Sequence, residues 1–155
     1  MKRAIICDID QCLLDSLQPI ALKNKAVLTS NLPEEECWNF FYENLDLCKR
    51  NEWCFTLLEQ MTLDNDIEVI FITGREEKAR KDTEKYFQFR HPIKYQLFMR
   101  PNNCTFPDAT VKAEILENII DEYEFLFAID DREANCEVFR MFGITTLKAK
   151  SVELH

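Results

Sequence analysis

The chain has 155 residues, of which 46% are hydrophobic and 30% are charged, a composition typical of one globular domain with a buried core. Its two glycines, Gly74 and Gly143, are too few for the phosphate loop of an ATPase or for a GxGxxG dinucleotide fingerprint. The net charge of −9 is the opposite of the basic balance of nucleic-acid-binding domains. These features exclude a P-loop kinase and an NAD-binding domain, and they argue against tight binding along a duplex.

The cysteines and the apolar runs indicate the cellular compartment of the protein. Seven cysteines include no CxxC pair, and an odd number cannot all pair in disulfides, so we expect reduced and mostly buried thiols. The longest apolar run, Phe125 to Ile129, is far shorter than the roughly 20 residues that a membrane-spanning helix needs. We therefore expect a cytoplasmic protein without membrane contacts.

The apolar runs and helical patterns alternate along the chain. Short runs without polar alternation predict β-strands at residues 4–7, 69–72 and 125–129, with weaker candidates at 95–99 and 145–147. Helical patterns lie between them at residues 76–89, 109–123 and 133–142. Strands of this kind are typical of a parallel sheet that is covered on both faces. The order predicts an α/β fold: a doubly wound, Rossmann-like parallel sheet with helices on both faces.

Residues 16–63 interrupt this alternation. They contain helical patterns at 34–47 and 52–61, no predicted strand, and too many residues for one crossover helix. We expect residues 1–155 to form a single domain in which residues 16–63 are a helical insertion or small cap over one end of the sheet. Its aromatic side chains either stack on a nucleobase or, as we expect for most of them, form helical core: Trp38, Phe40, Phe41, Trp53 and Phe55.

Charge is distributed unevenly around this insertion. Residues 31–68 hold ten acidic and two basic side chains, whereas residues 75–100 hold eight basic and four acidic ones. The second stretch is therefore locally positive, with a net charge of +4.

Polar residues follow each of the three main strands. Ligands of open parallel sheets bind outside the carboxyl ends of the strands, and Lys112 begins the helix before the third strand. Each of these polar residues alone is typical of a turn or a helix cap. Together they predict a binding site that has carboxylates for a metal ion, hydrogen-bond donors for phosphate oxygens and one cationic side chain. The residues at the strand ends are Asp8 and Asp10, Thr73, Gly74 and Arg75, and Asp130 and Asp131.

In this order the residues resemble the haloacid dehalogenase superfamily of aspartate-nucleophile phosphatases. The similar segments are Asp8 to Asp10 with Leu13 to Ser16, Phe71 to Arg75, Lys112, and Ile129 to Arg132. Within this superfamily the chain is most similar to the 3'-phosphatase domains of bacteriophage polynucleotide kinases, in Met99-Arg100 and in Asp108, four residues before Lys112.

The resemblance implies a catalytic mechanism. Asp8 would attack phosphorus and form an aspartyl-phosphate, and Asp10 would act as general acid and then as general base. Lys112 would offset the negative charge of the nucleophile and the phosphoryl group.

The resemblance also implies ligands for a metal and for phosphate. Mg²⁺ would be bound by Asp8, by the backbone carbonyl of Asp10 and by one of Asp130 and Asp131, the choice between the last two being open. Phosphate and substrate would be bound by Thr73, Gly74, Arg75 and Arg100.

Two departures from the family pattern affect these expectations. Gln11-Cys12 occupies the turn where most members have Gly-Thr, and that turn normally uses the conformational freedom of glycine. Pro19 lies where the phage domains have a basic residue near the substrate, which weakens the argument for a nucleic-acid substrate.

Three hypotheses of function follow. The first is a Mg²⁺-dependent phosphomonoesterase acting on the 3'-phosphate end of a nucleic acid, and the second is the same chemistry on a small nucleotide or other phosphorylated metabolite. The third is a non-enzymatic receiver-like module, in which the acidic pair should follow the first strand, whereas Asp130-Asp131 comes last. The sequence indicates no protein partner.

Overall fold

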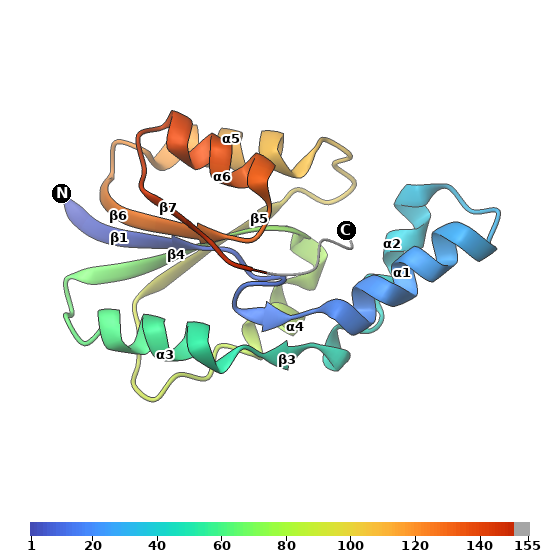
Figure 1. Ribbon diagram of the computed structural model, residues 1–155, viewed down its shortest axis with the longest axis horizontal. Coiled ribbons are helices and arrows are strands. Elements are labelled where there is room, and N and C mark those ends of the chain that lie inside the picture. Colours follow the sequence, from blue (N-terminus) through green and yellow to red (C-terminus); the bar gives the residue numbers. More distant parts are fainter. Residues whose placement is uncertain (151–155) are drawn as a thin grey trace.

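The computed structural model describes residues 1–150, which are organised around one five-stranded parallel sheet (Figure 1). The strand order is β5-β4-β1-β6-β7, so β1 is central and the chain continues first to one side of it and then to the other. The five predicted strands and the doubly wound α/β fold are confirmed. The strands are β1 (Lys2–Cys7), β4 (Ile67–Glu76), β5 (Tyr95–Arg100), β6 (Tyr123–Asp130) and β7 (Thr146–Lys148).

Helices cover both faces of this sheet, as predicted (Figure 1). On one face lie α5 (Asp108–Ile119) and α6 (Glu133–Met141), and on the other lies α3 (Glu52–Met61). The side chains of β1 alternate between two apolar clusters: Ile5 and Cys7 belong to the cluster with α3, and Ala4 and Ile6 belong to the cluster with α5 and α6. Because successive residues of a strand point to opposite faces, the continuous apolar run reflects burial on both sides.

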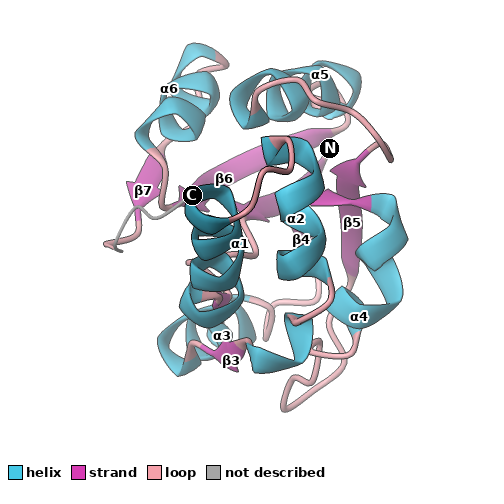
Figure 2. Cartoon of the chain, turned by 90° about the vertical axis from the view of Figure 1, so that its right-hand side faces the viewer, coloured by secondary structure: helices cyan, strands magenta, loops and turns pink. Residues whose placement is uncertain are grey.

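The segment between β1 and β4 has two parts. Helices α1 (Leu17–Thr29) and α2 (Glu34–Tyr42) form a hairpin that projects beyond the strand ends (Figures 1 and 2). Helix α3 instead packs on the face of the sheet opposite α5 and α6 (Figure 1). The expectation of no strand in this segment is wrong, because β3 (Lys49–Arg50) pairs antiparallel with β2 (Leu14–Asp15). This ribbon links the segment to the loop that follows β1.

Three predicted helices are shorter than expected. The helix predicted over 109–123 ends at Ile119, and Tyr123 begins β6. The helix predicted over 34–47 ends at Tyr42 and is followed by a separate 3₁₀ turn, Leu45–Leu47. The Asn44 side chain donates a hydrogen bond of 2.7 Å to the carbonyl of Phe40, which competes with the helical pattern.

The helix predicted over 76–89 is reduced to a 3₁₀ turn, Glu77–Ala79, and α4 (Arg80–Glu84). The aromatic residues at the end of the predicted helix lie in a loop and pack against the sheet. The ring of Phe87 stacks on that of Phe71 with centroids 4.6 Å apart. Arg50 also donates hydrogen bonds to the carbonyls of Tyr86 and Gln88. Tertiary packing therefore overrides the local helical pattern.

The cysteine prediction is confirmed: all seven are free thiols, and all but Cys104 are buried. Within residues 1–150 no helix combines the length and the apolar character needed to cross a membrane.

The aromatic residues of the 16–63 segment differ in burial. Phe55 on α3 is 0% exposed, and its ring centroid lies 5.1 Å from that of Phe89. Trp53, on the same helix, is 51% exposed. Helical core is therefore the role of Phe55 and of the buried Phe41, whereas Trp53 and Phe40 face solvent.

This difference predicts how two truncations on one helix affect stability. Phe55→Ala should lower the free energy of unfolding by about 3–5 kcal/mol, because it opens a cavity in the core. Trp53→Ala, the matched control, should change it by about 0.5 kcal/mol or less. Urea unfolding measures both values, and equal losses would contradict the packing of α3.

Candidate active site

The loop after β1 makes a tight turn with a residue other than glycine in the left-handed region. Gln11 has φ of 62°, a conformation that favours glycine. Its backbone N–H donates to the carbonyl of Leu14 at 2.7 Å, and its side-chain Oε1 accepts a hydrogen bond of 2.7 Å from the N–H of Ser16. The tight turn after Asp10 therefore forms without the glycine of the family pattern, and the hydrogen bond to the Gln11 side chain stabilises it.

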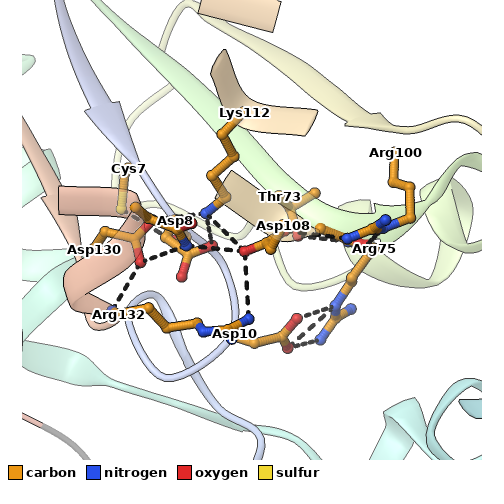
Figure 3. Close-up of polar contacts among 12 residues, drawn as sticks. Cys7, Asp8, Asp10, Thr73, Arg75, Arg100, Asp108, Lys112, Asp130 and Arg132 are labelled. Carbon is orange, nitrogen blue, oxygen red and sulfur yellow. Dashed lines mark hydrogen bonds and ion pairs between the residues drawn. The ribbon is translucent and has the colours of Figure 1, made fainter. Parts of the chain in front are cut away.

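A buried lysine joins two carboxylates at the centre of the site (Figure 3). Lys112 Nζ, on α5, donates to Asp8 Oδ1 at 2.9 Å and to Asp130 Oδ2 at 2.6 Å. Burial by itself lowers the pKa of Lys112, but the negative charges of Asp130 and Asp8 outweigh burial and hold this pKa well above its usual value. The side chain is therefore a fixed positive charge at the ends of β1 and β6.

Three buried carboxylates form a candidate site for a divalent cation. Oxygen atoms of Asp8, Asp130 and Asp131 all lie within 4.8 Å of one another. Burial and the charge of Asp130 raise the pKa of Asp8 well above its usual value, against the opposing effect of Lys112. An all-oxygen donor set of three carboxyl groups, which the single charge of Lys112 compensates only in part, fits a hard cation such as Mg²⁺. The carboxylate of Asp10 is not part of this group.

Asp10 instead accepts hydrogen bonds from Arg75 (Figure 3) and from Ser16. Arg75 donates to its carboxylate from Nε to Oδ2 at 3.0 Å and from Nη2 to Oδ1 at 2.6 Å. Ser16 donates its hydroxyl to Asp10 Oδ1 at 2.5 Å, and Thr83 accepts from Arg75 Nη1 at 2.9 Å. The sequence led us to expect Arg75 as a phosphate ligand, and the structure places its buried guanidinium on Asp10. Ser16 belongs to the segment that resembles the family, but no role for it was predicted from the sequence.

Arg100 braces the walls of the site. Its Nε donates to the carbonyl of Gly74 at 2.8 Å, and its Nη1 donates to the carbonyls of Cys104 and Phe106. Its Nη2 lies 3.5 Å from Asp108 Oδ1. The expected substrate-binding guanidinium is thus turned toward the protein in this structure.

Thr73 and Gly74 lie at the end of β4, as predicted. The hydroxyl of Thr73 is buried and accepts a hydrogen bond of 3.1 Å from the N–H of Arg75. A Cβ atom on Gly74 would overlap the carboxylate of Asp108, so a larger residue here would displace that side chain.

Two further residues of the site carry no role in the sequence-based predictions. Asp108 lies one helical turn before Lys112, with Oδ2 3.8 Å from its Nζ. Asn135 donates to Asp108 Oδ2 at 2.9 Å and to Asp130 Oδ1 at 3.2 Å. Burial raises the pKa of Asp108, but Lys112 and Asn135 outweigh that effect and lower it. The four-residue spacing before Lys112 was the available signal for Asp108, whereas Asn135 had none.

A cavity of about 570 Å³ opens above Asp8 and Asp10. Its walls include the first turn of α2, which carries three consecutive glutamates, Glu34 to Glu36, and the loops after β4 and β5. Lys78 and Arg132 line it with side chains that are 45% and 37% exposed. The site therefore has a buried charged floor, an acidic wall and two accessible cations.

Comparison with known proteins identifies relatives of this chain. A family model described as the polynucleotide kinase PNKP phosphatase domain matches residues 36–153. A protein of Autographa californica nuclear polyhedrosis virus named "Putative bifunctional polynucleotide kinase/RNA ligase" is 25% identical over 150 residues. That match covers 94% of this chain and 19% of the viral protein, so the chain spans about a fifth of the relative.

Solved structures share the fold. A chain of the Pnkp1/Rnl/Hen1 complex has a TM-score of 0.68 and 24% identity, covering 96% of this chain and 46% of that one. A haloacid dehalogenase family enzyme of Bacteroides thetaiotaomicron has a TM-score of 0.59 and 14% identity, covering 99% of this chain and 97% of that one. The Bacteroides structure is a complex with magnesium and inorganic phosphate.

The three carboxylates predict stabilisation by a divalent cation. Mg²⁺ should raise the thermal unfolding midpoint, because an ion at 100 times its dissociation constant adds about 2.7 kcal/mol to stability. Asp131→Asn should lose most of this gain, whereas Asp121→Asn, on the exposed surface, should keep it. Thermal unfolding with Mg²⁺ and with a chelator measures the gain, and an equal gain in both variants would place the cation elsewhere.

The gain should also depend on pH. A carboxyl group whose pKa is raised in the folded protein, as for Asp8, contributes stability below its unfolded pKa and loses it as the pH rises through the folded value. The cation-free protein should therefore lose stability as the pH rises, and the gain from Mg²⁺ should grow. A gain that shrinks with rising pH would contradict the carboxylate cluster as its source.

Proposed function

The chain belongs to the family of polynucleotide kinase PNKP phosphatase domains, and we propose that it hydrolyses phosphate monoesters through an aspartyl-phosphate, with Mg²⁺ as cofactor. The observation that carries this proposal is the contact between Lys112 Nζ and Asp8 Oδ1, 2.9 Å long, below a cavity of substrate size. A receiver-like module is disfavoured by membership of a phosphatase family.

Asp8 is the proposed nucleophile. One of its carboxylate oxygens forms a bond to phosphorus while the bond from phosphorus to the ester oxygen breaks. The ammonium group of Lys112 faces this carboxylate and offsets part of the negative charge that collects when nucleophile and phosphoryl group meet. The first product is an alcohol, and the phosphoryl group remains on Asp8.

Asp10 is the proposed general acid and base. In the first step the protonated form of Asp10 passes its proton to the departing ester oxygen and becomes the carboxylate that accepts hydrogen bonds from Arg75 and Ser16. In the second step this carboxylate takes a proton from the water that attacks the aspartyl-phosphate. The hydrogen bonds from Arg75 and Ser16 fix its orientation. The second step releases inorganic phosphate and returns both carboxyl groups to their starting state.

Oxygen atoms of Asp8, Asp130 and Asp131 would hold Mg²⁺. When bound, the ion supplies positive charge for the carboxylates and for phosphate oxygens. Asn135 and the backbone N–H of Arg132 each donate to Asp130 Oδ1, which orients this carboxylate. The magnesium and phosphate in the Bacteroides structure of the same fold support this assignment.

The proposed substrate is the 3'-phosphate end of a nucleic acid. Family membership and the named activity of the viral relative, polynucleotide kinase/RNA ligase, support this class. The acidic wall from Glu34 to Glu36 disfavours a long polyanion, so few phosphates next to the end would be contacted. A small phosphorylated nucleotide is the second candidate, and the same acidic wall favours it.

Replacing the nucleophile tests the chemistry. Asp8→Asn should reduce phosphate release to below about 1% of the wild-type rate, because an amide of similar shape cannot attack phosphorus. Asp121→Asn should retain the rate, and circular dichroism should show both variants folded. The assay measures inorganic phosphate released with Mg²⁺ present. A folded Asp8→Asn variant with a substantial rate would remove Asp8 as nucleophile.

Replacing the two accessible cations tests the substrate. Lys78→Ala combined with Arg132→Ala should lower kcat/KM for a 3'-phosphorylated oligonucleotide more than for a 3'-mononucleotide. Lys81→Ala, on the exposed surface outside the cavity, is the matched control. Binding of a catalytically inactive variant to the single-stranded oligonucleotide should show a log affinity against log salt slope of about −0.7 to −1.4, equivalent to one or two phosphates. Equal losses for both substrates would favour the small nucleotide.

A further inference from the structure

Three cysteine sulfurs meet directly behind the nucleophile. Cys7 ends β1, Cys12 lies in the turn after it, and Cys54 lies on α3. All three side chains are buried, and their Sγ atoms lie within 4.8 Å of one another. The Sγ atoms of Cys7 and Cys54 are 3.6 Å apart. Figure 3 shows Cys7 beside Asp8, where the chain passes from this cluster into the active site.

The spacing of the sulfurs is that of a metal site. A metal–sulfur bond of about 2.3 Å places the three sulfurs of a trigonal site about 4 Å apart. The Sγ atoms of Cys7 and Cys54 are 3.6 Å apart, and all three sulfurs lie within 4.8 Å of one another, so small movements would let the three side chains surround an ion.

We propose that Cys7, Cys12 and Cys54 form a binding site for a soft monovalent cation, Cu⁺, separate from the hard-cation site of Asp8, Asp130 and Asp131. Thiolate sulfur selects soft cations such as Cu⁺ and is a poor ligand for Mg²⁺. Zn²⁺ prefers four ligands, and within residues 1–150 the group holds three. Ligand softness therefore separates two ions that bind on either side of the β1 strand end.

The ion would connect two parts of the fold. Cys7 and Cys12 flank the loop that carries Asp8 and Asp10, and Cys54 belongs to the helix that packs beneath the sheet. Binding would bring the three sulfurs to one common spacing and shift that loop. Displacement of catalytic groups by about 1 Å can cost about 100-fold in rate, so a smaller shift of Asp8 should cost about tenfold. This consequence, unlike the site itself, rests on the proposed phosphatase function.

The site is tested with the intact, reduced chain and Cu⁺ under anaerobic conditions. The protein competes for Cu⁺ with a chelator of known affinity. The incubation lasts long enough for local opening to expose the buried cluster. Native mass spectrometry counts bound copper, and thiolate-to-copper absorption in the ultraviolet reports the ligands. We expect one tightly bound Cu⁺ per wild-type chain.

Matched cysteine variants locate the ion. Cys54→Ser should weaken Cu⁺ binding at least tenfold, and Cys12→Ala should do the same if Cys54→Ser fails to fold in a thermal melt. Cys37→Ser, which removes a buried cysteine of α2 outside the cluster, should bind as the wild type does. Equal affinity in the cluster variants and the control would overturn the site. A copper-free chain lighter by the mass of two hydrogen atoms would also overturn it, since that loss would indicate oxidation of two thiols to a disulfide.

Phosphate release by the copper-loaded and copper-free protein tests the coupling. We expect copper to lower the rate of phosphate release about tenfold in the wild type. Cys37→Ser keeps the cluster, so copper should lower its rate to the same degree. Equal rates with copper bound would overturn the coupling to the loop. A protein that binds Cu⁺ through the cluster but releases no phosphate in either form would refute the phosphatase function while upholding the site.

Discussion

The compensation of buried carboxylate charge by Lys112 is the interaction on which the rest of the site depends. Asp8 and Asp130 end two adjacent strands of the sheet, and both carboxyl groups are removed from water. Buried charges of like sign are costly unless a counter-charge is near. Lys112 supplies that charge from α5, and Gly74 allows Asp108 on the same helix to approach the end of β4. The central strand, its neighbours and one helix are thereby locked to one geometry.

Arg75 and Arg100, the other cationic side chains near the centre of the site, also donate hydrogen bonds to groups of the protein. Arg75 orients Asp10, and Arg100 ties the carbonyls of three cavity residues. Guanidinium groups suit both tasks because their donors have a fixed planar geometry. Lys78 and Arg132 are then the cavity cations with substantially exposed side chains. An acidic protein can thus stabilise a reacting phosphoryl group and still have little attraction for a long polyanion.

The segment from residue 16 to 63 contributes to the site in two ways. The α1–α2 hairpin supplies the acidic wall of the cavity. Its flanking residues reach the catalytic loop: Ser16 donates to Asp10, and Cys48 donates to the Ser16 hydroxyl at 3.4 Å. Cys54 on α3 touches Cys7 from the opposite side of the loop. Changes in this segment can therefore act on Asp10, the proposed general acid and base, through Ser16.

The sequence by itself determined the sheet and the floor of the site. Apolar runs located β1, β4 and β6 because burial on both faces leaves no polar alternation. The edge strands β5 and β7 are more exposed and were weaker candidates. The polar residues at their ends identified Asp8, Asp10, Thr73 and Asp130, because the carboxyl ends of parallel strands share one edge.

Only the tertiary structure decided the partners of each side chain. Arg75 meets Asp10 across 65 positions, and Lys112 meets Asp8 across 104, separations for which local periodicity carries no signal. The helix after β4 was shortened by contacts of Phe87 with Phe71 in the sheet. The thiol cluster likewise joins residues 47 positions apart. Sequence patterns report which face a residue buries, whereas the contact it makes depends on how distant elements pack.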